Sequence, residues 1–143
     1  MRTTAPIILR IGISLVIIWF GAQQLLDASL WVGYLPDWTH ALPISQIGLV
    51  HLNGLFEVIA GLALLAGFYT RIAAILLALH LLEITYTVGY GQIGVRDFGL
   101  TIALLSVFFY GADKWSADRA FDRARSDLAQ NDGSIARSDL DTL

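Results

Sequence analysis

The feature that most constrains this chain is the scarcity of charge over most of its length. Between Ile11 and Gly111 only seven residues carry a formal charge, and long apolar stretches separate them. A soluble fold spreads charge over its whole surface, whereas lipid hydrocarbon excludes charge. Charged residues make up 15% of the chain, against about 25% in typical soluble domains. The sequence therefore predicts a membrane protein with a polar C-terminal tail. The seven charged residues are Asp27, Asp37, Glu57, Arg71, Glu83, Arg96 and Asp97.

Four segments are long and apolar enough to cross a bilayer, whose core takes about 20 apolar residues per helix. We expect spans at about 6–26, 46–68, 70–89 and 95–112. Backbone polar groups in lipid must be satisfied within the protein, so these spans are predicted to be helices. The expected fold class is all-α, a polytopic membrane protein whose four-helix transmembrane domain covers residues 1–112. We interpret the first span as a retained helix rather than a signal peptide, because no convincing small-x-small cleavage site follows it.

The polar C-terminal region divides into two parts. Residues 113–130 place Ala117, Phe121, Ala124 and Leu128 at helical spacing, with Asp and Arg between them. This pattern predicts a short amphipathic helix on the membrane surface or at the base of the bundle. Residues 131–143 are polar, and we expect them to be disordered.

The positions of Lys and Arg predict the orientation. Basic residues precede the first span, occupy the short turn between the second and third spans, and follow the fourth. The loop at 27–45 contains none. By the positive-inside rule, we expect a multi-pass protein of the cell (inner) membrane with both termini in the cytoplasm. The loop also carries Trp31, Tyr34 and Trp38, which favour the membrane interface; it is either an interfacial anchor or a lid over an outward-facing pocket.

Glu57 is the most unusual residue of the spans, because it lies near the middle of the second one. A charge at such depth costs roughly 2.5–3.5 kcal/mol on insertion scales, so the side chain is expected to face protein. Asn53, Gly54 and Gly61 share its helical face, and small residues there let a neighbouring helix approach closely. Glu57 is either a neutral, hydrogen-bonded packing residue or an acid that handles protons or a ligand.

Further polar residues suggest a cavity inside the bundle that opens toward the outer side. His80 and Glu83 lie one turn apart in the third span, and Arg96 is the only basic residue expected on the outer side, where we predict an ion pair with an acid. The alternative is a structural clamp that joins the outer ends of the helices. We predict that Glu57, His80 and Glu83 form the floor of the cavity and are the catalytic candidates for proton handling. The candidate ligand-binding residues are Gln24, His51, Asn53, Arg96 and Asp97.

The composition also argues against several kinds of site. The chain has no cysteine, which excludes disulfides, thiolate metal sites and iron–sulfur clusters from this chain. Haem ligation by two histidines is disfavoured, because His51 lies about 9 Å outward of Glu57 at 1.5 Å per residue, while His80 lies near the midplane. No established ligand spacing supports a metal held by Glu57, His80 and Glu83, so we predict no metal and no cofactor held by this chain alone. No aromatic-interleaved basic patch suggests a nucleic-acid partner.

The stretch "GLFEVIAGLALLAGFYTRIAA" at 54–74 resembles the signature of the DoxX family of small membrane proteins. The shared pattern is Gly54, Glu57, Gly61 and then Gly-x-x-Thr-Arg at 67–71; "LRIGISLVIIWFGAQQLLD" and "VRDFGLTIALLSVFFYG" also match the family layout. The resemblance covers roughly residues 7–112. It implies a four-helix membrane bundle and a link to redox chemistry, since a related subunit belongs to thiosulfate:quinone oxidoreductase. Because the chain has no cysteine, a role in which this subunit itself relays thiols is not expected.

Three functions remain open at this stage. The first is a membrane subunit of a redox system that binds a quinone or similar hydrophobic molecule, with electrons supplied by a partner subunit. The second is a non-catalytic scaffold or anchor for a partner complex. The third is a small proton-coupled transporter of an apolar or weakly acidic molecule. Besides the lipid bilayer, a redox partner subunit and a second copy of the chain are the expected partners.

Overall fold

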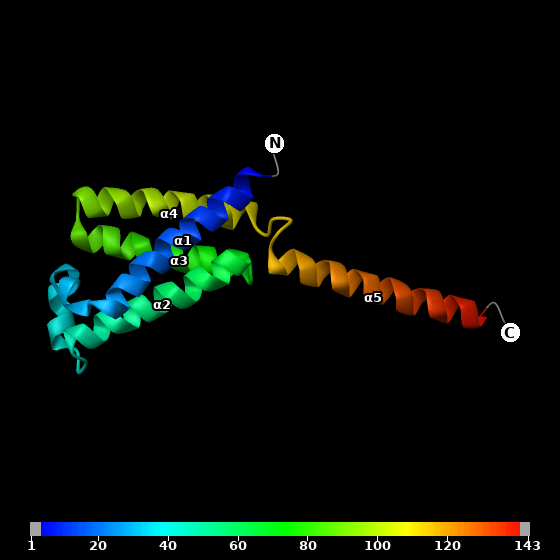
Figure 1. Cartoon of the computed structure of the whole chain (residues 1–143), viewed down its shortest axis with the longest axis horizontal. Helices are drawn as coiled ribbons and strands as arrows, with labels where there is room; N and C mark the ends of the chain where they lie inside the picture. Colours follow the sequence, from blue (N-terminus) through cyan, green and yellow to red (C-terminus); the bar gives the residue numbers. More distant parts are fainter. Residues whose placement is uncertain (1–3, 141–143) are drawn as a thin grey trace.

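The computed structural model describes residues 4–140, and describes side chains as far as Gln130. Four long helices form the bundle: α1 (Ala5–Leu26), α2 (Gln46–Ala66), α3 (Thr70–Val88) and α4 (Gln92–Tyr110). All four are long and apolar enough to span a membrane, which confirms the predicted all-α membrane bundle. A fifth helix, α5 (Ala117–Leu140), leaves one end of the bundle (Figure 1). The connection from α1 to α2 contains three short 3-10 helices, η1 (Ala28–Leu30), η2 (Val32–Tyr34) and η3 (Asp37–Ala41).

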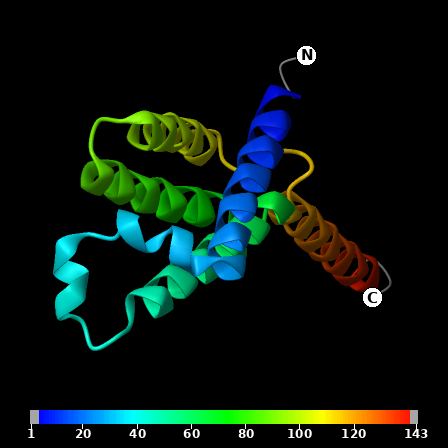
Figure 2. The ribbon, with the colours of Figure 1, turned by 60° about the vertical axis from the view of Figure 1, so that its left-hand side comes forward.

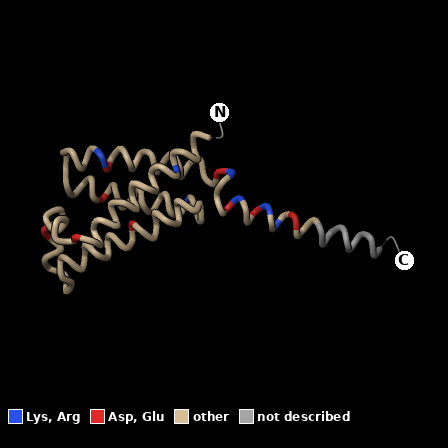
Figure 3. The backbone as a smooth tube through the Cα atoms, viewed as in Figure 1, with Lys and Arg blue, Asp and Glu red and all other residues tan. Residues whose placement is uncertain are grey.

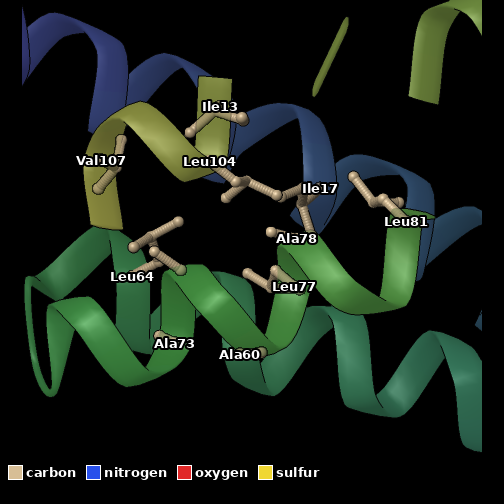
Figure 4. Close-up of a cluster of buried hydrophobic side chains, with 11 residues drawn as sticks. Ile13, Ile17, Ala60, Leu64, Ala73, Leu77, Ala78, Leu81, Leu104 and Val107 are labelled. Atoms are coloured by element: carbon tan, nitrogen blue, oxygen red, sulfur yellow. The ribbon is translucent and has the colours of Figure 1, made fainter. Parts of the chain in front are cut away.

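The bundle consists of two helical pairs. Helix α1 packs mainly on α2, and α3 packs mainly on α4, while α2–α3 and α1–α4 contacts join the pairs. Helices α3 and α4 run side by side in both ribbon views (Figure 2). An apolar core fills the centre, where Leu64, Leu77 and Leu104 are fully buried (Figure 4). Large apolar side chains such as Ile8, Leu79 and Phe109 point outward, as expected for surfaces that face lipid.

The turn between α2 and α3 is joined to the start of α5. Gly67 ends α2 in the left-handed region, at φ 69°, where glycine carries no side-chain penalty. A Cβ on Gly67 would lie 2.5 Å from the Cβ of Ser116, so the two segments touch directly. Asp118 accepts hydrogen bonds from the backbone N–H groups of Tyr69 and Thr70, each at 2.8 Å, and from the Thr70 hydroxyl. Because α3 has no side-chain cap of its own, α5 supplies it.

A buried ion pair closes the same end of the bundle. Arg10 Nε donates to Asp113 at 2.7 Å, and each side chain is 2% exposed. Arg10 also donates to the carbonyl oxygens of Leu64 and Leu65 at the end of α2. Burial by itself raises the pKa of Asp113, but the Arg10 hydrogen bond and charge and the Trp115 N–H outweigh it and leave the pKa below 3.8. The pKa of Asp118 is likewise lowered, since the donors of Thr70 and Tyr69 outweigh desolvation.

Helix α5 differs from the sequence expectation in its bounds and its placement. It begins at Ala117 rather than 113 and continues to Leu140. It projects away from the bundle (Figure 1), and Phe121 and Leu128 are exposed, so this helix does not pack on the bundle base. Its placement on the membrane surface, the other alternative, stays a prediction. Disorder was predicted for residues 131–143. The side chains of 131–140 and the whole of 141–143 lie outside the described part of the chain.

Charge is distributed unequally between the two ends of the molecule (Figure 3). Arg10, Arg71, Lys114 and Arg119 lie at the end from which α5 leaves, whereas Arg96 is the one Lys or Arg at the opposite end within the described residues. The long connection at 27–45 and the α3–α4 turn lie at this second end (Figure 1).

Candidate functional site

The site begins with a close crossing of α1 and α2. Gly21 and Gly54 face each other, and a Cβ on either would lie 2.7 Å from the carbonyl oxygen of the other. Each glycine comes three residues before a polar residue, Gln24 on α1 and Glu57 on α2. The absence of two side chains at the crossing therefore lets these two polar groups meet inside the bundle.

Glu57 is the centre of a hydrogen-bonded cluster contributed by three helices. Gln24 Nε2 donates to Glu57 Oε2 at 2.8 Å. Asn53 Nδ2 donates to Gln24 Oε1 at 2.7 Å and to Glu57 Oε1 at 3.2 Å. Glu57 is 3% exposed, so the sequence prediction that it faces protein agrees with the structure. Within the described residues every buried side-chain nitrogen and oxygen has a partner, which makes this cluster a fully connected network.

His80 joins the cluster from α3. Its Nε2 lies 3.3 Å from Glu57 Oε1, and its ring packs edge-on against Phe56 with the ring centroids 5.0 Å apart. The imidazole is thus held between an acid and an aromatic ring. Because imidazole and carboxylate are both proton-exchanging groups, the pair can pass a proton between α2 and α3.

Arg96 and Asp97 form a second polar group on α4. Arg96 Nε donates to Asp97 Oδ1 at 2.7 Å, and Asp97 is 2% exposed. The guanidinium carbon of Arg96 lies 4.1 Å from the centroid of the Phe20 ring, a cation–π contact that reaches from α4 to α1. Of the acids that could have paired with Arg96, the structure selects its sequence neighbour.

A cavity of about 120 Å³ is lined by residues of both polar groups. An apolar cavity of roughly 150 Å³ takes up a benzene molecule, while drug-sized ligands occupy roughly 300–1,000 Å³. The cavity is therefore on the scale of one aromatic ring. Its polar lining residues are Gln24, Asn53, Glu57, Glu83, Thr87, Arg96 and Asp97. Its apolar lining includes Ile17, Phe20, Val50, Leu81, Ile84, Val88, Ile93 and Leu100.

The connection at 27–45 contributes part of the cavity wall. Trp31, Tyr34, Leu35 and Pro36 line the cavity, and the Trp31 ring packs edge-on against Phe20. Trp38, in contrast, is 63% exposed and does not line it. The two interpretations of this loop therefore apply to different halves: the first half covers the cavity, and the second carries the exposed ring suited to a membrane interface.

Three of the predicted site residues depart from the predicted arrangement. His80 contacts Glu57 but does not itself line the cavity, although it was predicted to form the floor. Glu83 lines the cavity but is exposed, and its Oε1 accepts from Thr87 at 3.0 Å rather than facing His80. Residues three apart on a helix are separated by about 60° around its axis, and here the Glu83 side chain turns toward Thr87, one turn further along α3, rather than back toward His80. His51, predicted as a ligand-binding residue, is exposed on α2 and does not line the cavity.

Sequence reasoning missed the parts of the site that carry no charge. Gly21 and Phe20 were not singled out, although Gly21 sets the helix crossing and Phe20 lies beneath Arg96. A signal was present: Gly-x-x-polar occurs at 21–24, 54–57 and 94–97, so each of three spans has a glycine one turn before a buried polar residue. The glycine pattern, read together with the polar residues, predicts the close crossing.

One of three comparisons relates the chain to known proteins. No curated protein and no solved structure matches it. The DoxX family model matches residues 5–89, more than half of the chain. The matched region holds the Glu57 cluster and Glu83 but ends before Arg96 and Asp97. With four helices able to span a membrane and this match across the first three, the chain belongs to the DoxX family of membrane proteins.

Proposed function

We propose that this chain is a subunit of a membrane redox system that binds the ring of a quinone or a similar hydrophobic molecule in the cavity beside Glu57. The observation that carries the proposal is the connected cluster of Gln24, Asn53, Glu57 and His80 at the edge of a ring-sized cavity. A purely structural polar cluster does not need an adjoining cavity. The aromatic rings of Phe20 and Trp31 offer stacking surfaces for a planar ligand.

The ring would exchange protons with Glu57, which passes them to His80. The cavity holds only the ring, so an isoprenoid tail would extend between helices into lipid. The part of this chain is to bind the ring and to exchange protons. Electrons come from a partner subunit, which carries the redox centre; without cysteine, this chain supplies no thiolate ligands for an iron–sulfur cluster. The family resemblance to a quinone-linked oxidoreductase subunit supports the same assignment.

The protein spans the inner membrane of the cell in this proposal. The charge distribution supports an orientation in which both termini lie in the cytoplasm. The basic residues gather at the end where α1 begins and α5 leaves (Figure 3), as the positive-inside rule requires. The cavity then opens in the outer half of the bilayer.

Extraction of the full-length protein in mild detergent, followed by mass spectrometry of the bound small molecules, tests the proposal. We expect a quinone or related ring compound to co-purify with the wild type and with His51→Gln, which alters an exposed histidine outside the cavity. Glu57→Gln and Phe20→Ala should lose most of it. Recovery of no ring compound, or equal recovery from all four proteins, would refute the proposal.

A scaffold is the second candidate, favoured by one observation. On the projecting helix α5, Phe121 is 64% exposed and Leu128 is 67% exposed, and both lie on one helical face. Such a face suits a protein partner. If the scaffold function is the correct one, Phe121→Ser with Leu128→Ser removes a co-purifying protein, while Glu57→Gln has no effect on assembly.

A further inference from the structure

The cavity has an unequal supply of hydrogen-bond donors and acceptors, and this inequality bears on the chemical form of its ligand. At the floor, most of the donors are already engaged. Asn53 Nδ2 uses both protons, one on Gln24 and one on Glu57, and Gln24 Nε2 directs one of its two protons to Glu57. A ligand that approaches the floor therefore meets the acceptor oxygens of Glu57 and one remaining amide proton of Gln24.

Glu57 has room for one more donor. A carboxylate offers about four lone-pair positions, two on each oxygen. Oε1 receives Asn53 and His80, while Oε2 receives only Gln24. Glu57 lines the cavity, so the fourth position on Oε2 is the natural site for an O–H group of a ligand. A carbonyl oxygen placed there would face a carboxylate oxygen, and two acceptors repel.

The second polar group that lines the cavity, on α4, offers donors. Arg96 uses Nε for Asp97, and among the described residues no hydrogen bond reaches either of its Nη atoms. Arg96 is only partly buried, lines the cavity, and is held over the Phe20 ring. An oxygen that accepts a hydrogen bond is the matching ligand group at this wall.

We propose that the pocket prefers the hydroxyl-bearing form of its ring ligand, a hydroquinone or related phenol, over the oxidised quinone. One ring O–H donates to Glu57 Oε2, and the oxygen at the other end of the ring accepts from Arg96. A quinone has two acceptor oxygens, so it satisfies Arg96 and leaves Glu57 opposite a carbonyl. The inference rests on the proposed function, because it assumes that an aromatic ring occupies the cavity.

Three ring compounds of similar size separate the alternatives: methylhydroquinone, methyl-1,4-benzoquinone and 1,4-dimethoxy-2-methylbenzene. The ether keeps the oxygens of the hydroquinone but removes both donors. Their affinities are measured without oxygen for the full-length protein in lipid nanodiscs, with empty nanodiscs as the correction for partitioning into lipid. We expect wild type to bind the hydroquinone about tenfold more tightly than either of the other compounds, the effect of about one hydrogen bond.

Glu57→Gln supplies an N–H at the floor, so the preference should fall to about twofold or less, since the amide serves a carbonyl as well as a hydroxyl. His51→Gln is the matched control and should retain the wild-type preference. Circular dichroism checks that Glu57→Gln is folded; the comparison of the three ligands on wild type stands without it. Equal or tighter binding of the quinone by wild type would overturn the preference alone. If none of the three compounds binds above empty nanodiscs, the ring-binding function itself is overturned.

Discussion

Replacing Gly54 by alanine is the sharpest test of how the site is built. The added methyl group would lie 2.7 Å from the carbonyl oxygen of Gly21 and 2.9 Å from the Cβ of Gln24. Ordinary contact begins at 3.4 Å, so α1 must move away from α2 by about 0.7 Å at the crossing. Neither contact is with the free end of a flexible side chain, so rotation about side-chain bonds cannot relieve the clash.

The same displacement acts on the Glu57 cluster one turn away. The Gln24–Glu57 hydrogen bond measures 2.8 Å, and a separation of 0.7 Å lengthens it to about 3.5 Å, the limit at which such a bond is lost. Overpacking of this kind costs roughly 1–3 kcal/mol in stability. We therefore expect Gly54→Ala to lower the thermal stability and also to weaken ring binding.

Thermal unfolding in detergent, followed by circular dichroism, and the nanodisc binding assay measure the two effects. Gly12→Ala on α1 is the matched control, because a Cβ on Gly12 meets nothing within 4 Å. Alanine is the better helix former by about 1 kcal/mol, so the control should be neutral or slightly stabilising. If Gly54→Ala unfolds at the temperature of the control and binds the ring equally well, the glycine crossing does not position the site.

Three further predictions concern the end of the bundle where α5 begins and the orientation of the chain. Arg10→Met leaves Asp113 buried without its partner and should cost roughly 3–5 kcal/mol in stability, whereas the double variant with Asp113→Leu should recover most of the loss; thermal unfolding of both variants decides this, and a double variant as unstable as the single one would contradict it. The pKa values of Asp113 and Asp118 are lowered in the folded protein, so their stabilisation is complete above about pH 4 and is lost as the pH falls through their folded pKa values. Unfolding measured from pH 6 to pH 3 should show this decline, and it should be smaller in Asp118→Asn; an identical decline in the variant would argue against the contribution of Asp118. Because the chain has no cysteine, single cysteines at the exposed positions Ala41 and Ala120 report topology: an impermeant maleimide should label Ala41→Cys in intact cells and Ala120→Cys only after lysis, and the reverse pattern would invert the proposed orientation.

The number, type and approximate positions of the spans could be predicted because each depends on a local property, the run of apolar residues. The fourth helix begins at Gln92 rather than 95, which places Arg96 and Asp97 in its second turn. The predicted span already included these two charges, but Gln92, Ile93 and Gly94 before them follow a glycine-containing turn and gave no clear signal of a helix start. Their mutual ion pair and the Phe20 contact satisfy the charges inside the helix.

The partners of the polar residues were harder to predict, because they depend on how helices distant in the sequence approach one another. Glu57 could be assigned to a protein-facing position from its depth alone. That His80 would contact Glu57 rather than Glu83 depends on the rotation of α3, and the apolar pattern of a lipid-facing helix constrains rotation weakly. Arg10 was interpreted only as an orientation signal, and nothing near it in the sequence indicates Asp113, which lies 103 residues away.

The capping of α3 by Asp118 has a consequence for biogenesis. The backbone N–H of Thr70, at the start of α3, donates to Asp118, which lies 48 residues further along the chain. Arg10 is separated from the carboxylate of Asp113 by 103 residues. During synthesis, the early helices must therefore enter the membrane with open ends that are closed only when the segment after α4 leaves the ribosome. A nascent chain that stops short of Asp113 leaves the Arg10 guanidinium without its carboxylate and the first amides of α3 without their cap.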